Sequence, residues 1–239
     1  MAGLQERQIR ATQRVDGKGR RTIIVYQAYN SQIARAAVAS NSFCGPMQAG
    51  LWSKERMTWI KPSAVWMGYR CGWGIYKDRN QTNILALTIP LDKLYELLSI
   101  AVLSSHDGKS GGGKARPKDS NVVVQWDPER FLAPNNGTDR KKKPIAQTPT
   151  VDKNVYTKKI GSGSGRDIRS IQIGLRKEAV AMLLDPTVVI KIEDVTEKFH
   201  ACGHALAAGD EAAAMSLLEI DEQTLHSVPL DIQSNLCMI

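Results

Sequence analysis

The stretch Arg-Met-Thr-Trp-Ile-Lys-Pro-Ser-Ala-Val-Trp-Met-Gly-Tyr-Arg, residues 56–70, is the most informative part of the chain. It begins with an alternation typical of a short strand, which Pro62 ends. The proline and the serine after it suit the first turn of a helix. In that helix Trp66, Tyr69 and Arg70 recur at spacings of three and four residues and share one face. The stretch therefore predicts a strand, a turn and an aromatic helix.

Three aromatic side chains of this stretch, Trp59, Trp66 and Tyr69, are candidate substrate-binding residues. Large aromatic residues interleaved with cations are costly to bury unless each polar end finds a partner. One interpretation places these rings in the hydrophobic core. The other makes them a platform on which a nucleobase or nicotinamide ring stacks. We place the active or binding centre in this stretch, and both interpretations of the rings stay open.

Cations surround these aromatic residues. Arg56 and Lys61 are either strand-edge cations in salt bridges or phosphate ligands, arginine through bidentate hydrogen bonds and lysine as a point charge. Arg70, Arg169 and Arg176 join them if the folded sheet brings their segments together. We predict that Arg56 or Lys61, with Arg70 or Arg176, lines one concave pocket for a phosphate-bearing ligand.

Polar residues gather where two further predicted strands end. Tyr26 and Gln27 end the first strand, and Glu129 follows the second, Asn121–Trp126. We expect the catalytic residues to be the Glu129 carboxylate, Tyr26 and Gln27, lying within reach of one another, because strand ends hold functional groups rigidly. The alternative is an exposed turn capped by aspartate. The other candidate substrate-binding residues in these strand-end segments and in a later strand are Gln125, Trp126, Asp127 and Gln172.

The order of predicted elements favours an α+β fold with a mixed, mainly antiparallel sheet flanked by helices, because several strands follow one another without a helix between them. We divide the chain into a flexible basic arm (1–20), a core domain (21–199) and a helical C-terminal tail (200–239). Residues 104–120 and 132–167 have low-complexity, Gly- and Lys-rich sequences, and we expect mobile segments or lids there.

The composition favours an anionic partner. The net charge of +8 suits a nucleotide, RNA or an acidic surface. The four cysteines lack a regular spacing and no secretory signal precedes them, so we expect reduced thiols in an intracellular, cytoplasmic or nuclear protein. No apolar run has the length of a membrane span. His200, Cys202 and His204 lack the partners that complete a zinc pattern, so no metal site is predicted.

Five blocks of the sequence resemble the family known as domain of unknown function 4291, over about residues 20–200. The blocks that carry the resemblance are Val25–Asn30, residues 56–70, Gln125–Arg130, Arg169–Arg176 and Ile192–Thr196. The resemblance specifies a family and implies no established chemistry.

The order of these blocks is also similar to the three-part site of NAD-consuming transferases. In those enzymes one strand holds the nicotinamide ribose, an aromatic residue stacks on the ring, and a glutamate supports an oxocarbenium-like transition state. The likeness implies a group-transfer enzyme with an ADP-ribosyltransferase-like fold, NAD as a possible cofactor and Glu129 as the glutamate. Tyr26 and Gln27 stand where that site usually begins with histidine or arginine.

Two alternatives accompany this hypothesis. The first is an RNA-dependent enzyme, acting on RNA ends or on charged tRNA, whose basic loops hold the backbone. The second is a non-catalytic module that binds nucleic acid or nucleotides, for which steep salt dependence without turnover is expected.

Overall fold

The computed structural model describes residues 5–75, 79–104, 120–132, 157–159, 167–219 and 221–238. They form a single α+β domain in which two five-stranded sheets pack against each other. The predicted fold class is confirmed. The segments expected to be mobile, 104–120 and 132–167, lie almost entirely outside the described residues.

The first sheet is antiparallel throughout. Its strands, in spatial order, are β11 (Lys191–Asp194), β5 (Asn83–Pro90), β3 (Arg21–Tyr29), β2 (Arg10–Val15) and β12 (Glu222–Thr224).

The second sheet is mixed and centres on one long strand. Strand β10 (Asp167–Leu175) has two partners on one side: β1 pairs in parallel with the first half of β10, and β4 pairs antiparallel with the second half. On the other side β10 pairs antiparallel with β7, and β7 pairs in parallel with β6. These partners are β1 (Gln5–Gln8), β4 (Thr58–Ile60), β7 (Val122–Pro128) and β6 (Val102–Leu103). A separate pair joins β8 (Arg130–Leu132) to β9 (Thr157–Lys159).

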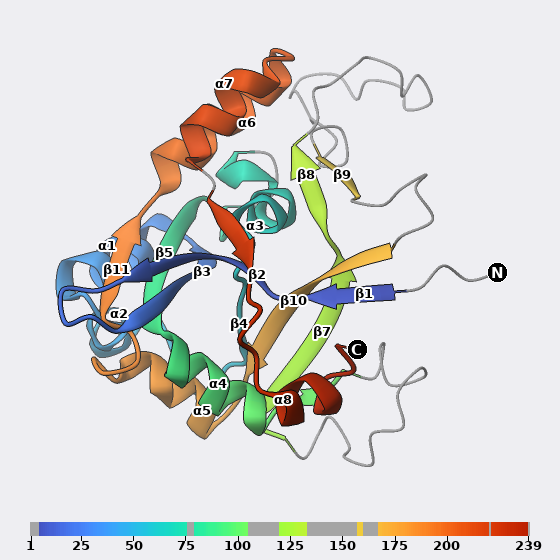
Figure 1. Cartoon of the computed structure of the whole chain (residues 1–239). Coiled ribbons are helices and arrows are strands. Elements are labelled where there is room, and N and C mark those ends of the chain that lie inside the picture. Colours follow the sequence, from blue (N-terminus) through green and yellow to red (C-terminus); the bar gives the residue numbers. More distant parts are fainter. Residues whose placement is uncertain are drawn as a thin grey trace.

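Helices cover both ends of the two sheets. Figure 1 shows α4, α5 and α8 together at one end, with α3, α6 and α7 toward the other. The helices are α1 (Ser31–Ser40), α2 (Cys44–Gln48), α3 (Ala64–Cys71), α4 (Leu91–Ser99), α5 (Glu178–Ala181), α6 (Thr196–Ala207), α7 (Glu211–Leu218) and α8 (Leu230–Asn235), with short 3₁₀ turns η1 (Gly72–Gly74) and η2 (Met182–Leu184).

One hydrophobic core lies between the sheets. It includes Val25 of β3 and Leu87 of β5 from the first sheet, and Val124 of β7 and Ile173 of β10 from the second. Alternate residues of a strand face opposite sides, so each of these strands also presents residues to the other face of its sheet. On β3 and β5 this other face packs in a second hydrophobic cluster, whereas on β7 and β10 it is available for a site.

Among the described residues, an isolated bridge between Tyr26 and Lys61 links the two sheets. Each backbone N–H of this pair donates to the other residue's carbonyl oxygen, at 2.7 Å from Tyr26 and 3.1 Å from Lys61. On one side of the bridge β3 continues in the first sheet, whereas β4 pairs only with the second. The two sheets therefore separate beyond this bridge.

The predicted strand and helix of residues 56–70 are both present, as β4 and α3. Ser63 caps the helix: its hydroxyl accepts a hydrogen bond from the Trp66 backbone N–H at 3.2 Å. At its other end Gly72 adopts a left-handed conformation with φ +62°, which glycine takes without strain. The helix also packs closely on Trp73, because a Cβ at Gly68 would collide with the Trp73 ring.

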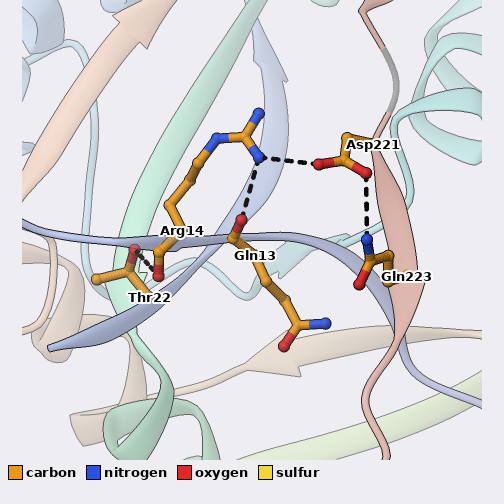
Figure 2. Close-up of polar contacts among 5 residues, drawn as sticks. All are labelled: Gln13, Arg14, Thr22, Asp221 and Gln223. Carbon is orange, nitrogen blue, oxygen red and sulfur yellow. Dashed lines mark hydrogen bonds and ion pairs between the residues drawn. The ribbon is translucent and has the colours of Figure 1, made fainter.

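The N-terminal residues correct one expectation. Residues 5–15, predicted as part of a solvated arm, instead form β1 and β2, and the predicted helical tail contributes the strand β12. Figure 2 shows polar contacts beside this pairing, where Asp221 accepts from Arg14 Nη1 and from Gln223 Nε2, each at 3.4 Å. The sequence does not reveal β1, β2 and β12, because many of their residues are polar and their pairing partners are far away in sequence.

Candidate functional site

A pocket of about 730 Å³ opens where the two sheets diverge. Its volume falls in the range of small-molecule sites, about 300–1,000 Å³. The end of β3, β4, α3, β7 and β10 all contribute to its lining. Three segments singled out in the sequence thus meet the end of β3 at this pocket. They are residues 56–70, Gln125–Arg130 and Arg169–Arg176.

The floor of the pocket is a polar cluster on β7 and β10. The strand register sets Gln125 opposite Gln172, while Val124 and Ile173 face the core. The two glutamine amides hold one carboxylate: Gln125 Nε2 donates to Asp127 Oδ1 at 3.0 Å, and Gln172 Nε2 donates to Asp127 Oδ2 at 2.6 Å. Asp127 is therefore a pre-positioned carboxylate among the residues that line the pocket.

Gln27 lines the pocket and carries a buried acceptor. Its side-chain nitrogen donates to Thr58 Oγ1 at 2.9 Å and to the Trp59 carbonyl oxygen at 3.2 Å. A carbonyl oxygen only accepts, so this contact fixes the orientation of the amide. The residue is 2% exposed, and its Oε1 has no hydrogen-bond partner among the described residues. Leaving such an atom unsatisfied costs about 1–3 kcal/mol, and the oxygen itself is closed to solvent.

Lys61 is a buried cation in the wall of the pocket. It is 7% exposed, and its Nζ lies 5.3 Å from the centroid of the Trp66 ring. Burial lowers the pKa of Lys61 to about 7, the nearby positive charge of Arg70 acts in the same direction, and Cys71 and Asp127 oppose them. Near neutral pH this amine is thus present in both its charged and its neutral form.

Aromatic rings complete the lining. Trp59, Trp66 and Tyr69 all contribute, as does Tyr29 at the end of β3. The guanidinium of Arg130 stacks on Tyr69, with Cζ 3.3 Å from the ring centroid. This contact orders the Tyr69 ring, so the pocket has a fixed flat surface beside its polar floor.

A second pocket of about 520 Å³ adjoins the first, and both are lined by Tyr29, Met57 and Thr58. Arg56 lines this second pocket and not the first. The first pocket is therefore lined by two cations of the predicted phosphate site, Lys61 and Arg70. Arg56 lines the adjoining pocket.

Several candidate residues lie away from the main pocket. Tyr26 faces the opposite side of β3, where its ring packs on Phe199 at 5.8 Å between centroids. Trp126 is 3% exposed in the core, and its indole N–H donates to the Leu236 carbonyl at 3.0 Å. Arg169 and Arg176 are not among the lining residues. The roles predicted for these four side chains gain no support from their positions.

Glu129 occupies a buried site of its own. It is 2% exposed, and its Oε1 accepts from Ser63 Oγ at 3.2 Å and from the Arg130 backbone N–H at 2.8 Å. Burial raises its pKa. Glu129 is not among the residues that line the main pocket, so its expected position at the pocket edge is not observed. It instead supports the first turn of α3.

Glu222 is a neighbour of Glu129 that sequence reasoning missed. Its carboxylate accepts a hydrogen bond from the Ala64 backbone N–H, at the first residue of α3. Burial, and secondly the charge of Glu129, raise the pKa of Glu222 to about 8. No local pattern distinguishes this residue in the sequence, because its partner lies 158 positions earlier.

The sequence comparison agrees with the resemblance noted above. A family model described as a domain of unknown function (DUF4291) matches residues 8–145. The chain belongs to this family. The DUF4291 match includes Gln27, the 56–70 stretch and Asp127, and ends before Gln172. No curated protein matches the chain.

Two properties hold for the described residues. None of their helices combines the length and apolar character needed to cross a bilayer. They also contain no group of three or more His, Cys, Asp or Glu side chains arranged to hold a metal ion. The His200 ring of the sequence motif noted above lies instead 3.2 Å from the Thr82 carbonyl oxygen.

Proposed function

We propose that this protein is a group-transfer enzyme whose nucleotide-type substrate binds in the main pocket, where the two sheets diverge. One observation carries the proposal: a pocket built from segments far apart in the sequence combines aromatic rings, two cations and a carboxylate held by two amides. Aromatic rings can stack on a base, a cation can bind a phosphate, and a carboxylate can stabilise positive charge on a reacting sugar.

Each group has a part in this proposal. The rings of Trp59 and Tyr69 would take the planar base, and Arg70 would bind phosphate. NAD fits this description and is the donor we would test first, as an ADP-ribosyltransferase-like activity requires.

The catalytic carboxylate in this proposal is Asp127 instead of Glu129, because only Asp127 lines the pocket. Its charge would stabilise positive charge that develops on a ribose, or accept a proton from the attacking group. The amides of Gln125 and Gln172 hold both of its oxygens, and this fixes the direction in which it acts.

The test compares three variants with the wild-type protein. Asp127→Asn should lower turnover of the nucleotide about 10²-fold or more while substrate affinity changes little. Asp221→Asn, on an exposed carboxylate far along the chain, is the matched control and should keep full activity. Glu129→Gln should retain turnover; loss in that variant alone would restore Glu129 to the catalytic role. Unaltered turnover in Asp127→Asn would refute the proposal.

An RNA substrate is the second candidate, favoured by the net charge of +8. RNA binding by phosphate contacts should weaken steeply as salt rises. Titration of a labelled RNA at increasing salt, beside the nucleotide assay, separates the two: salt-dependent binding with no turnover of any substrate would indicate a binding module.

A further inference from the structure

The Lys61 amine has surroundings that differ from those of a structural salt-bridge lysine. Its Nζ makes no hydrogen bond to any described residue, although the side chain is buried. An ammonium ion has three donors and is costly to bury without acceptors. The geometry therefore favours the neutral amine, which is a nucleophile.

The charged groups around Lys61 act in both directions. On α3, Arg70 disfavours an ammonium ion and Cys71 favours it, and Asp127 on β7 also favours it. Desolvation is larger than any of these effects. Trp66 shields the nitrogen on one side through its ring, and the open side is the pocket.

We infer that Lys61 is an amine nucleophile that forms an imine with a phosphate-bearing aldehyde, such as an open-chain sugar phosphate, in the main pocket. The amine nitrogen adds to the carbonyl carbon and gives a carbinolamine. This intermediate loses its hydroxyl as water and leaves a C=N bond, with no oxidant or reductant required. Arg70, which lines the same pocket, would bind the phosphate.

Asp127 can serve the dehydration step from its position in the pocket. Addition leaves the amine nitrogen with an extra proton; the Asp127 carboxylate can take this proton and deliver it to the carbinolamine hydroxyl, which then leaves as water. This inference uses the same pocket as the proposed function. It does not depend on nucleotide turnover.

The experiment traps the imine by reduction. The wild-type protein is incubated at pH 7 with ribose 5-phosphate, or with pyridoxal 5′-phosphate as a more reactive probe, and then reduced with borohydride. Peptide mass spectrometry locates the adduct. Lys61 should be modified at least about tenfold faster than Lys93 or Lys198, because a pKa near 7 leaves about half of this amine neutral and an ordinary lysine has about 10⁻³ or less.

Two matched comparisons sharpen the test. Lys198 is exposed, Lys93 is partly exposed, and they are ion-paired to Glu219 and Glu96, so they report the background reactivity of lysine within the same sample. Unphosphorylated ribose or pyridoxal should react with Lys61 more slowly than its phosphate ester, and Arg70→Ala should abolish that difference. Modification of Lys61 at the background rate, or equal reaction with and without phosphate, would overturn the inference.

The outcome is separable from that of the proposed function. An inert Lys61 in a protein whose nucleotide turnover depends on Asp127 would refute this inference alone. Rapid trapping at Lys61 without any nucleotide turnover would refute the proposed function alone.

Discussion

Replacing Lys61 by methionine should make the protein more stable. Methionine keeps an unbranched apolar side chain of similar length and removes the charge. Burial lowers the pKa of Lys61 from 10.5 to about 7, whereas the unfolded chain keeps the ordinary value. Each unit of pKa corresponds to about 1.4 kcal/mol, so the protonated lysine costs the folded state about 5 kcal/mol at low pH and somewhat less at pH 7.

Part of this gain is offset by contacts that the variant loses. The contact with the Trp66 ring is worth about 0.5–2 kcal/mol. We therefore expect Lys61→Met to raise the free energy of unfolding by about 2–4 kcal/mol at pH 7. The unfolded state binds more protons than the folded state between the two pKa values, so wild-type stability should rise with pH from about 7 to 10. The advantage of the variant should shrink over that range.

Urea unfolding at several pH values, followed by tryptophan fluorescence, measures both quantities. Lys198→Met is the control, since this exposed, ion-paired lysine should change stability by no more than about 0.5 kcal/mol at any pH. A Lys61→Met protein that is less stable than wild type at pH 7, or a difference that stays constant with pH, would refute the account of a desolvated amine.

Three further predictions follow from the helix that carries the site. Gly68→Ala should destabilise the protein by about 1–3 kcal/mol in thermal or urea unfolding, because its Cβ meets the Trp73 ring, whereas Gly17→Ala, with open space around it, should have little effect. Ser63→Ala should cost about 1–2 kcal/mol in the same assay, since it removes the helix cap and the hydrogen bond to Glu129; wild-type stability would show that neither contact matters. The raised pKa of Glu222 means that the folded state binds more protons between pH 4.5 and 8, so the contribution of this group to wild-type stability should fall over that range and Glu222→Gln should remove that fall; an identical pH profile in both proteins would contradict the shift.

Local signals in the sequence were sufficient for the strand and helix around residues 56–70. Pro62 ends the strand, and Ser63 caps α3, as expected of a serine just before a helix. The α+β class followed in the same way from the order of elements. The family resemblance followed from blocks of residues that need no three-dimensional information.

The composition of the site was only partly predictable. Tyr26 and Gln27 are adjacent in a strand, so they must face opposite sides, and only Gln27 lines the pocket. The alternation rule could have separated them from the sequence alone. Asp127 and Glu129 could not be separated in this way, because the strand ends at Pro128 and tertiary contacts with Ser63 decide where Glu129 points.

The pairing of strands from distant parts of the sequence has a consequence for folding. Strand β1 pairs with β10 across about 160 positions, and β2 pairs with β12 across about 210. Long-range pairing of this kind delays folding, because loop entropy is lost before the contacts form. The walls of the pocket belong to the same two sheets, so a competent pocket should form late. Recovery of ligand binding during refolding would then follow the slow phase in which these distant strands join, and not the earlier collapse of the local helices.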